Sequence, residues 1–146
     1  MDSGGFDNLS KDAKNYITSA RYIIGPKRHL SMLSACNASL ISWPVPFSKG
    51  LEMLLTRRGQ PSVMLTSGDP FWFGAGTQIT SHLSPDEWLA LPSHSCFSLC
   101  AAKLGWPLEK TLCLGLHAAP ISRLRPHLFP NRKILATIRD ESSVRE

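Results

Sequence analysis

Short apolar runs alternate with amphipathic stretches over the first half of the chain. Three runs end in turn-forming residues, which predicts strands over residues 21–25, 38–42 and 62–66. Apolar residues recur at helical spacing around them, which predicts helices over residues 10–20, 26–34 and 47–58. Ser10 stands where a helix cap belongs. Pro26 begins the second helix, where its missing N–H does no harm.

The second half of the chain continues the alternation less regularly. Helices are predicted over residues 74–82, 95–104 and 121–129, and strands over residues 111–116 and 133–138. Residues 84–87 resemble a helix capping box, but the apolar stretch that follows stops at Pro92, too soon for a normal helix. Residues 87–91 are therefore predicted to form a further strand.

This order of elements predicts the α/β class, with a parallel sheet and crossover helices. In such sheets, ligands bind at the carboxyl ends of the strands. The candidate site positions are therefore the turns that follow predicted strands, at Gly25, residues 67–70, residues 92–96 and His117.

The composition is that of a globular chain without a membrane span. Of 146 residues, 42% are hydrophobic and 18% are charged, and the apolar runs are far shorter than a bilayer crossing. No signal core follows the first residues, so we expect a cytoplasmic protein. The four cysteines include no Cys-x-x-Cys pair. Cys96 and Cys100 would share a helix face and could serve a metal, but reduced, buried cysteines and no metal site are the expectation.

The net charge of +5 suits a nucleic acid, an anionic membrane or a small molecule with several negative charges. The basic residues are scattered, and no aromatic residues are interleaved with them as on a single-strand nucleic-acid platform. We therefore expect neither a nucleic acid nor a membrane as partner. Binding of a nucleic acid remains an alternative function, which only the positive net charge supports.

The segment Ser67-Gly68-Asp69-Pro70 follows the strongest predicted strand. Gly68 permits close approach of a ligand to the backbone, and Asp69 could bind an ammonium group or hold the loop's own amides. By itself, such a segment is typical of a simple turn. The aromatic and glycine residues at 71–76 add an apolar wall beside it, which favours a binding loop, although core aromatics and a hinge would give the same pattern.

Five ordered segments resemble one protein family. Residues 65–74 carry its Gly-Asp-Pro motif, and residues 92–108 its Pro-x-x-Ser-x-Phe loop opening a helix. The family is that of the tetrapyrrole methylases. Residues 25–30, 43–47 and 114–117 are similar to the branch that methylates precorrin-6Y or the corresponding cobalt-precorrin.

The resemblance implies two α/β domains with S-adenosylmethionine in the cleft between them. It assigns cofactor contacts to Ser67, Gly68, Asp69, Trp72, Ser95 and Cys96. It also implies contacts to the carboxylates of a corrin precursor, which we expect from Arg28, His29 and His117. His117 is in addition the candidate for handling a proton. The alternatives are a plain helix cap for Ser95, a core residue for Cys96 and a structural role for His117.

The sequence departs from the family pattern at both ends. The family opens with a buried strand and a glycine-rich loop, and residues 1–10 look like the tail of that loop without the strand. We expect residues 1–139 to be a partial N-terminal methylase domain, and residues 140–146 a tail or the start of a linker to a second domain. Ala118 and Ala119 stand where the branch usually has glycine and arginine, which puts the substrate contact there in doubt.

The expected function is therefore S-adenosylmethionine-dependent C-methylation of precorrin-6Y, or of its cobalt equivalent, in cobalamin biosynthesis. One alternative is a non-catalytic remnant or a subunit of a split enzyme, and another is a methylase of a different precorrin. A homodimer or a complementary domain chain would be the protein partner.

Overall fold

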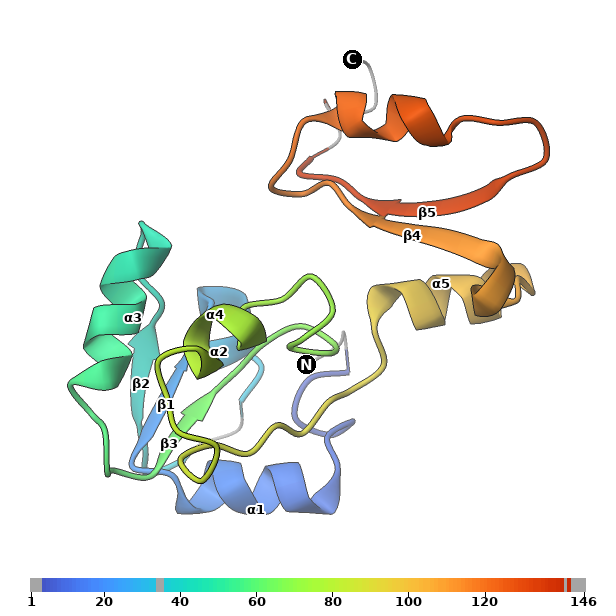
Figure 1. Cartoon of the computed structure of the whole chain (residues 1–146). Helices are drawn as coiled ribbons and strands as arrows, with labels where there is room; N and C mark the ends of the chain where they lie inside the picture. Colours follow the sequence, from blue (N-terminus) through green and yellow to red (C-terminus); the bar gives the residue numbers. More distant parts are fainter. Residues whose placement is uncertain (1–3, 34–35, 141, 143–146) are drawn as a thin grey trace. The chain divides into compact units, whose positions relative to one another are not determined.

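Three short strands form a parallel sheet in the first part of the chain: β1 (Tyr22–Gly25), β2 (Ser39–Ser42) and β3 (Ser62–Met64). The computed structural model describes residues 4–33, 36–140 and 142, and Figure 1 shows β1 between the other two strands. Ile23 pairs with Leu40 on one side and with Val63 on the other. The middle strand is the most buried, because Ile23 and Ile24 have neighbours on both sides and are fully shielded from solvent.

Four helices belong to the same part of the chain: α1 (Lys11–Ser19), α2 (Lys27–Leu30), α3 (Phe47–Leu55) and α4 (Gly76–Thr80). Ser10 caps α1, since its Oγ accepts a hydrogen bond from the amide of Ala13 at 3.2 Å. Ile17 of α1 packs against Ile23 and Leu65 in the core. This packing fixes α1 on the sheet and buries the residue after β3, from which the candidate loop starts.

The second part of the chain contains α5 (Cys96–Leu104), the 3₁₀ helices η1 (Leu108–Lys110) and η2 (Ile121–His127), and the strands β4 (Thr111–Gly115) and β5 (Lys133–Thr137). The two strands pair in parallel, with Cys113 opposite Leu135. Gly105 ends α5 in the left-handed region, at φ +63°. The chain divides into two units, Met1–His94 and Ser95–Glu146, and we describe each by itself.

The α/β class with parallel strands and connecting helices is confirmed. The strand predicted over residues 87–91 is wrong, because these residues belong to no sheet of the described chain. A strand needs a neighbour to pair with, and none of the described segments pairs with it. The strands accordingly fall into a sheet of three and a sheet of two instead of a single sheet.

Several helices are shorter or tighter than expected. The helix predicted over 26–34 spans only Lys27–Leu30, and Ser34 lies outside the described residues. The helix predicted near 121–129 is a 3₁₀ helix that contains Pro126. Proline has no amide hydrogen to donate within a regular α-helix, which is why this segment does not continue as one.

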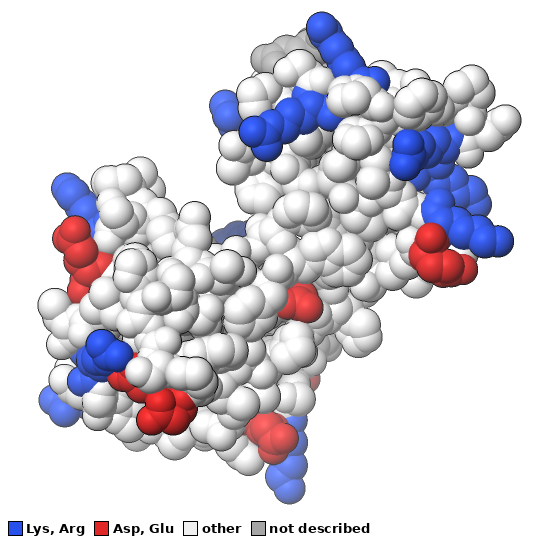
Figure 2. Space-filling model, viewed as in Figure 1, with Lys and Arg blue, Asp and Glu red and all other residues white. Residues whose placement is uncertain are grey.

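The excess of basic over acidic residues is unevenly shared between the two units. Eight of the 16 Lys and Arg residues, but only four of the 11 acidic residues, lie in the last 52 positions. Figure 2 shows basic side chains of the described residues over the part of the surface that this segment forms. None of the helices in the described ranges combines the length and the apolar character that a membrane crossing requires.

Candidate functional site

The ends of β1 and β3 bring two loops close together. Gly25 ends β1, and a Cβ placed on it would lie 2.9 Å from Cβ of Leu65 and 3.2 Å from its carbonyl oxygen. Only glycine permits this approach without displacing the chain after β3. The residues that follow each strand, 26–29 and 66–70, therefore start from neighbouring positions at the carboxyl edge of the sheet, where we expected a ligand site.

Arg28, His29 and Ser67 meet at this edge. One guanidinium nitrogen of Arg28 (Nη2) donates to Oγ of Ser67 at 2.6 Å, and Nε2 of His29 lies 3.4 Å from the same oxygen. Arg28 and Ser67 are exposed, whereas His29 is only 2% exposed. The structure thus brings together three residues that the sequence assigned to two different ligands, and it makes Ser67 the point where both basic side chains converge.

The environment of His29 favours its neutral form. Burial is the largest cause that lowers the pKa of His29, and the positive charge of Arg28 lowers the pKa further. The backbone of Leu65 acts in the opposite direction. Nδ1 of the ring has no hydrogen-bond partner within the described chain. His29 therefore contacts Ser67 from the buried side as an uncharged group. Arg28 carries the positive charge at the surface.

Asp69 holds the loop's own backbone. Its Oδ1 accepts a hydrogen bond from the amide of Phe71 at 2.8 Å, which is one of the two roles left open by the sequence. Gly68 adopts φ +55°, and its carbonyl accepts from Ser93 at 3.3 Å. The loop conformation therefore requires glycine at position 68 and a short acceptor at position 69.

Two further glycines enclose the end of the loop, and sequence reasoning missed their role. A Cβ on Gly74 or Gly76 would lie 2.5 or 2.6 Å from the carbonyl oxygen of Pro70, and Gly76 donates its amide to that oxygen at 2.8 Å. In the sequence, only the spacing of these glycines from Pro70 could have indicated this close approach. Between them and the loop in the sequence, Trp72 is 38% exposed.

The turn after β2 is held by aromatic packing. The rings of Trp43 and Phe47 lie 4.8 Å apart between centroids. A Cβ on Gly50 would lie 2.2 Å from the Trp43 ring, so the helix α3 can approach this ring only because residue 50 is glycine. The segment 43–47 that resembles the precorrin branch therefore has a packing role in this structure.

The remaining predicted site residues belong to the second unit. Ser95 is buried and caps α5, since its Oγ accepts from the amide of Ser98 at 3.1 Å. His117 is exposed just beyond β4, and its Nδ1 lies 3.1 Å from Oγ1 of Thr137, the last residue of the paired strand β5. Ser95 thus has the capping role that was one alternative.

The expectation of buried cysteines is wrong, because Cys36 and Cys113 are only half-buried and the other two are exposed. Cys96 and Cys100 are exposed, because α5 buries the adjacent face through Phe97 and Ala101. Among the described residues, no three His, Cys, Asp or Glu side chains are grouped so that they could hold a metal ion.

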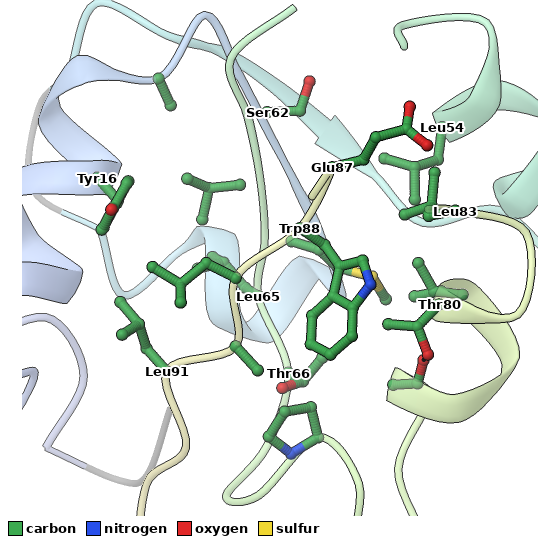
Figure 3. A pocket seen from close by; sticks show the side chains of 18 of the residues that line it. Tyr16, Leu54, Ser62, Leu65, Thr66, Thr80, Leu83, Glu87, Trp88 and Leu91 are labelled. Carbon is green, nitrogen blue, oxygen red and sulfur yellow. Dashed lines mark hydrogen bonds between the residues drawn. The ribbon is translucent and has the colours of Figure 1, made fainter. Parts of the chain in front are cut away.

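A cavity of about 730 Å³ lies in the first unit, along the side of β3 that faces away from β1. Its lining includes the residues of β3, the loop residues Gly68 and Pro70, and residues 86–91. Figure 3 shows Tyr16, Leu54, Leu83, Trp88 and Leu91 around this space. No pattern in the sequence indicates the cavity, because the cavity depends on which side of β3 remains unpaired within the described chain.

Comparisons with known proteins find relatives over most of the chain. The sequence model of the family Tetrapyrrole (Corrin/Porphyrin) Methylases matches residues 3–140. A precorrin-6Y C(5,15)-methyltransferase [decarboxylating] from Sinorhizobium sp is 34% identical over 97% of this chain. A protein of the same name from Mycobacterium tuberculosis is 28% identical over 88% of the chain. A cobalt-precorrin-7 C(5)-methyltransferase from Salmonella typhimurium is 25% identical over 84% of the chain. The chain spans only 35%, 32% and 61% of these relatives.

Proposed function

This chain belongs to the tetrapyrrole methylase family, and from that membership we propose that it takes part in S-adenosylmethionine-dependent C-methylation of precorrin-6Y or its cobalt equivalent. The reaction belongs to cobalamin biosynthesis. The observation that carries the proposal is the loop at residues 67–70, which the family motif marks and which Arg28 and His29 hold from the neighbouring strand end.

The donor set at this loop fits the amino-acid part of such a cofactor. Arg28 and the hydroxyl of Ser67 are exposed and close together, which suits a carboxylate. Gly68 keeps side-chain atoms away from the loop backbone, and Trp72 offers an apolar surface beside it. These residues would hold the methionine part of S-adenosylmethionine against the loop.

S-adenosylmethionine, when bound, supplies a methyl group that is already activated for transfer to carbon. The residues of the chain then have to align the reactants and exclude water, and alignment alone contributes about 7–11 kcal/mol in favourable cases. We assign alignment to the loop at 67–70, and its support to His29 acting through Ser67. Arg28 at the surface is the proposed contact for a substrate carboxylate as well.

The second unit contributes three proposed contacts. Cys96 is exposed in the first turn of α5, where free backbone amides favour an anion, and Ser95 shapes this turn by capping it. His117 is exposed at the end of β4 and would contact substrate or hold a proton through the nitrogen that does not face Thr137. We propose that a complementary domain or a second copy completes the cofactor site.

Calorimetry with S-adenosylhomocysteine and the variant Gly68→Ala tests the proposal. A side chain at φ +55° strains the loop by about 1–2 kcal/mol, and the altered loop should weaken binding about tenfold or more. Gly59→Ala is the matched control, because Gly59 adopts φ +79° with nothing within 4 Å of its Cβ position. It should lose similar stability and retain affinity.

Two outcomes would contradict the proposal. One is an equal loss of affinity in both glycine variants. The other is the absence of binding heat from the parent chain, both alone and with the C-terminal part of the Sinorhizobium relative added. Transfer of one or more methyl groups to precorrin-6Y, followed by mass spectrometry of the product, tests the substrate assignment separately.

A further inference from the structure

The hydroxyl oxygen of Ser67 accepts a hydrogen bond whose direction is fixed. Nη2 of Arg28 lies 2.6 Å from this oxygen, and a guanidinium group has N–H donors but no acceptor atom. A hydroxyl group offers one hydrogen and two lone pairs. Arg28 therefore occupies one lone pair of the Ser67 oxygen, and leaves the other lone pair and the O–H group for further partners.

The second neighbour of this oxygen is the ring of His29, which can act in either direction. Nε2 of His29 lies 3.4 Å from Oγ of Ser67. If Nε2 carries the ring hydrogen, Ser67 faces a second donor. If Nδ1 carries it instead, the hydroxyl of Ser67 can donate to Nε2. The position of the ring hydrogen therefore decides which group of Ser67 remains available to a ligand.

Two observations place the ring hydrogen on Nε2. Nδ1 is buried and has no hydrogen-bond partner within the described chain, and buried N–H groups without an acceptor are rare in native proteins. Burial keeps the pKa of His29 below its ordinary value, whereas a hydrogen bond with the backbone of Leu65 acts in the opposite direction. A backbone acceptor has this effect on a ring N–H group. Since Nδ1 has no partner, that N–H group belongs to Nε2.

Both neighbours therefore direct hydrogens toward the oxygen of Ser67, and neither can accept its O–H group. Ser67 is exposed, and its hydroxyl makes no further hydrogen bond within the parts of the chain that the structure describes. The hydroxyl hydrogen is thus available at the surface beside the positive charge of Arg28. A protonated His29 would carry a hydrogen on Nε2 as well, so the direction does not depend on the charge of the ring.

We infer that His29 is a positioning residue that fixes Ser67 as a hydrogen-bond donor toward the ligand. Ser67 and Arg28 then offer a ligand only hydrogens and positive charge, which attract a carboxylate and repel an ammonium group. The inference rests on the proposed function and adds an orientation to it. The methionine part of the cofactor places its carboxylate on Arg28 and Ser67, and its ammonium group points away from them.

The position of the ring hydrogen can be measured in the free chain. Long-range correlation spectra of the ¹⁵N-labelled protein distinguish a hydrogen on Nε2 from one on Nδ1, at a pH where the ring is neutral. His29→Gln removes the signals of this ring and thereby assigns them. We expect the Nε2–H form. The Nδ1–H form would overturn the inference whether or not the chain binds the cofactor.

Calorimetry tests the orientation with S-adenosylhomocysteine and two analogues, one without the carboxylate and one without the amino group. In the parent chain, loss of the carboxylate should weaken binding at least about tenfold, and more than loss of the amino group does. In Ser67→Ala, the loss caused by the missing carboxylate should shrink about tenfold. Ser67→Thr is the matched control, because it keeps a hydroxyl group and should behave like the parent.

His29→Leu tests the positioning role itself. Leucine offers no hydrogen, so the second lone pair of the Ser67 oxygen becomes free to accept from an ammonium group. The difference in affinity between the two analogues should therefore narrow in this variant. An unchanged difference in a folded His29→Leu variant would contradict the role of His29, and the spectra of the free chain decide the same point if the variant does not fold.

The source of the carboxylate is resolved by a further titration. A porphyrin with several carboxylates stands in for the substrate and is titrated into the parent chain and into Ser67→Ala. A loss of affinity for the porphyrin, with no change toward S-adenosylhomocysteine, would assign the donor pair to the substrate and overturn the orientation of the cofactor. A larger loss from the missing amino group than from the missing carboxylate would overturn it as well. Absence of S-adenosylhomocysteine binding by the parent chain would instead contradict the proposed function.

Discussion

The two units differ in how their strands are buried. In the first unit, β1 has a partner on each side, and three of its four residues are buried. In the second unit, β4 and β5 have only each other within the described chain, and no residue of either strand is fully buried. A sheet of two strands has little stability of its own. The comparison indicates that the first unit sets the geometry of the loop at 67–70, while the second depends more on what packs against it.

The largest effect is expected when a core isoleucine is shortened. Ile23→Ala removes a side chain that is 0% exposed in β1, and large-to-small changes of this kind cost about 2–5 kcal/mol. Ile134→Ala is the matched change in β5, where the side chain is half-buried, and we expect about 1–2 kcal/mol. Amide exchange resolved by residue gives the opening free energy of each unit. Equal losses of opening free energy in the two units would contradict the conclusion that the strands of the first unit are the more deeply buried.

A smaller effect, dependent on pH, is expected from His29. Its pKa is lowered below the ordinary value of 6.5 by burial and by Arg28, so the unfolded chain binds the proton more readily. The contribution to stability is therefore complete above about pH 6.5 and is lost as the pH falls below it. His29→Gln should flatten this loss in the first unit between about pH 7 and pH 5, measured by urea denaturation at each pH.

The exposed His82→Gln provides the control, since it removes an imidazole from the same unit without touching Ser67. If both variants flatten the pH profile equally, the assignment to His29 fails. If neither variant changed the pH profile, protonation of His29 would not contribute to the pH dependence of stability.

Much of the fold could be predicted because its signals are local. The strands β1 and β3 are apolar runs ended by glycine or by the loop at 67–70, and Ser10 marks a helix cap. The segment 87–91 has the same local signal, but its state depends on a neighbouring strand that the described chain does not provide. Pairing is a property of two segments, so a single apolar run cannot reveal it.

The site was predictable in part for the same reason. The loop at 67–70 and its family motif are contiguous, and the sequence alone located them. The contact of Arg28 and His29 with Ser67 joins residues 39 and 38 positions apart and follows from the adjacency of β1 and β3. Sequence reasoning placed Arg28 and His29 toward substrate. The burial of His29 and its contact with Ser67 became visible only in the folded chain.

The smallest effect is expected at the ion pair of Arg58 and Glu87. These side chains are solvent-exposed, and hydrogen bonds from Arg58 and from the amide of Ser84 lower the pKa of Glu87 to about 2. The pair therefore persists across the usual pH range, yet solvent screens it. Glu87→Gln should lower the urea midpoint of the first unit slightly at low salt and hardly at all at high salt. Asp86→Asn removes a neighbouring charge without breaking these hydrogen bonds, so it should change the midpoint less than Glu87→Gln does. A large, salt-independent drop of the urea midpoint in Glu87→Gln would instead show that residues 84–91 depend on this carboxylate for their position. A single surface contact would then keep these residues beside β3.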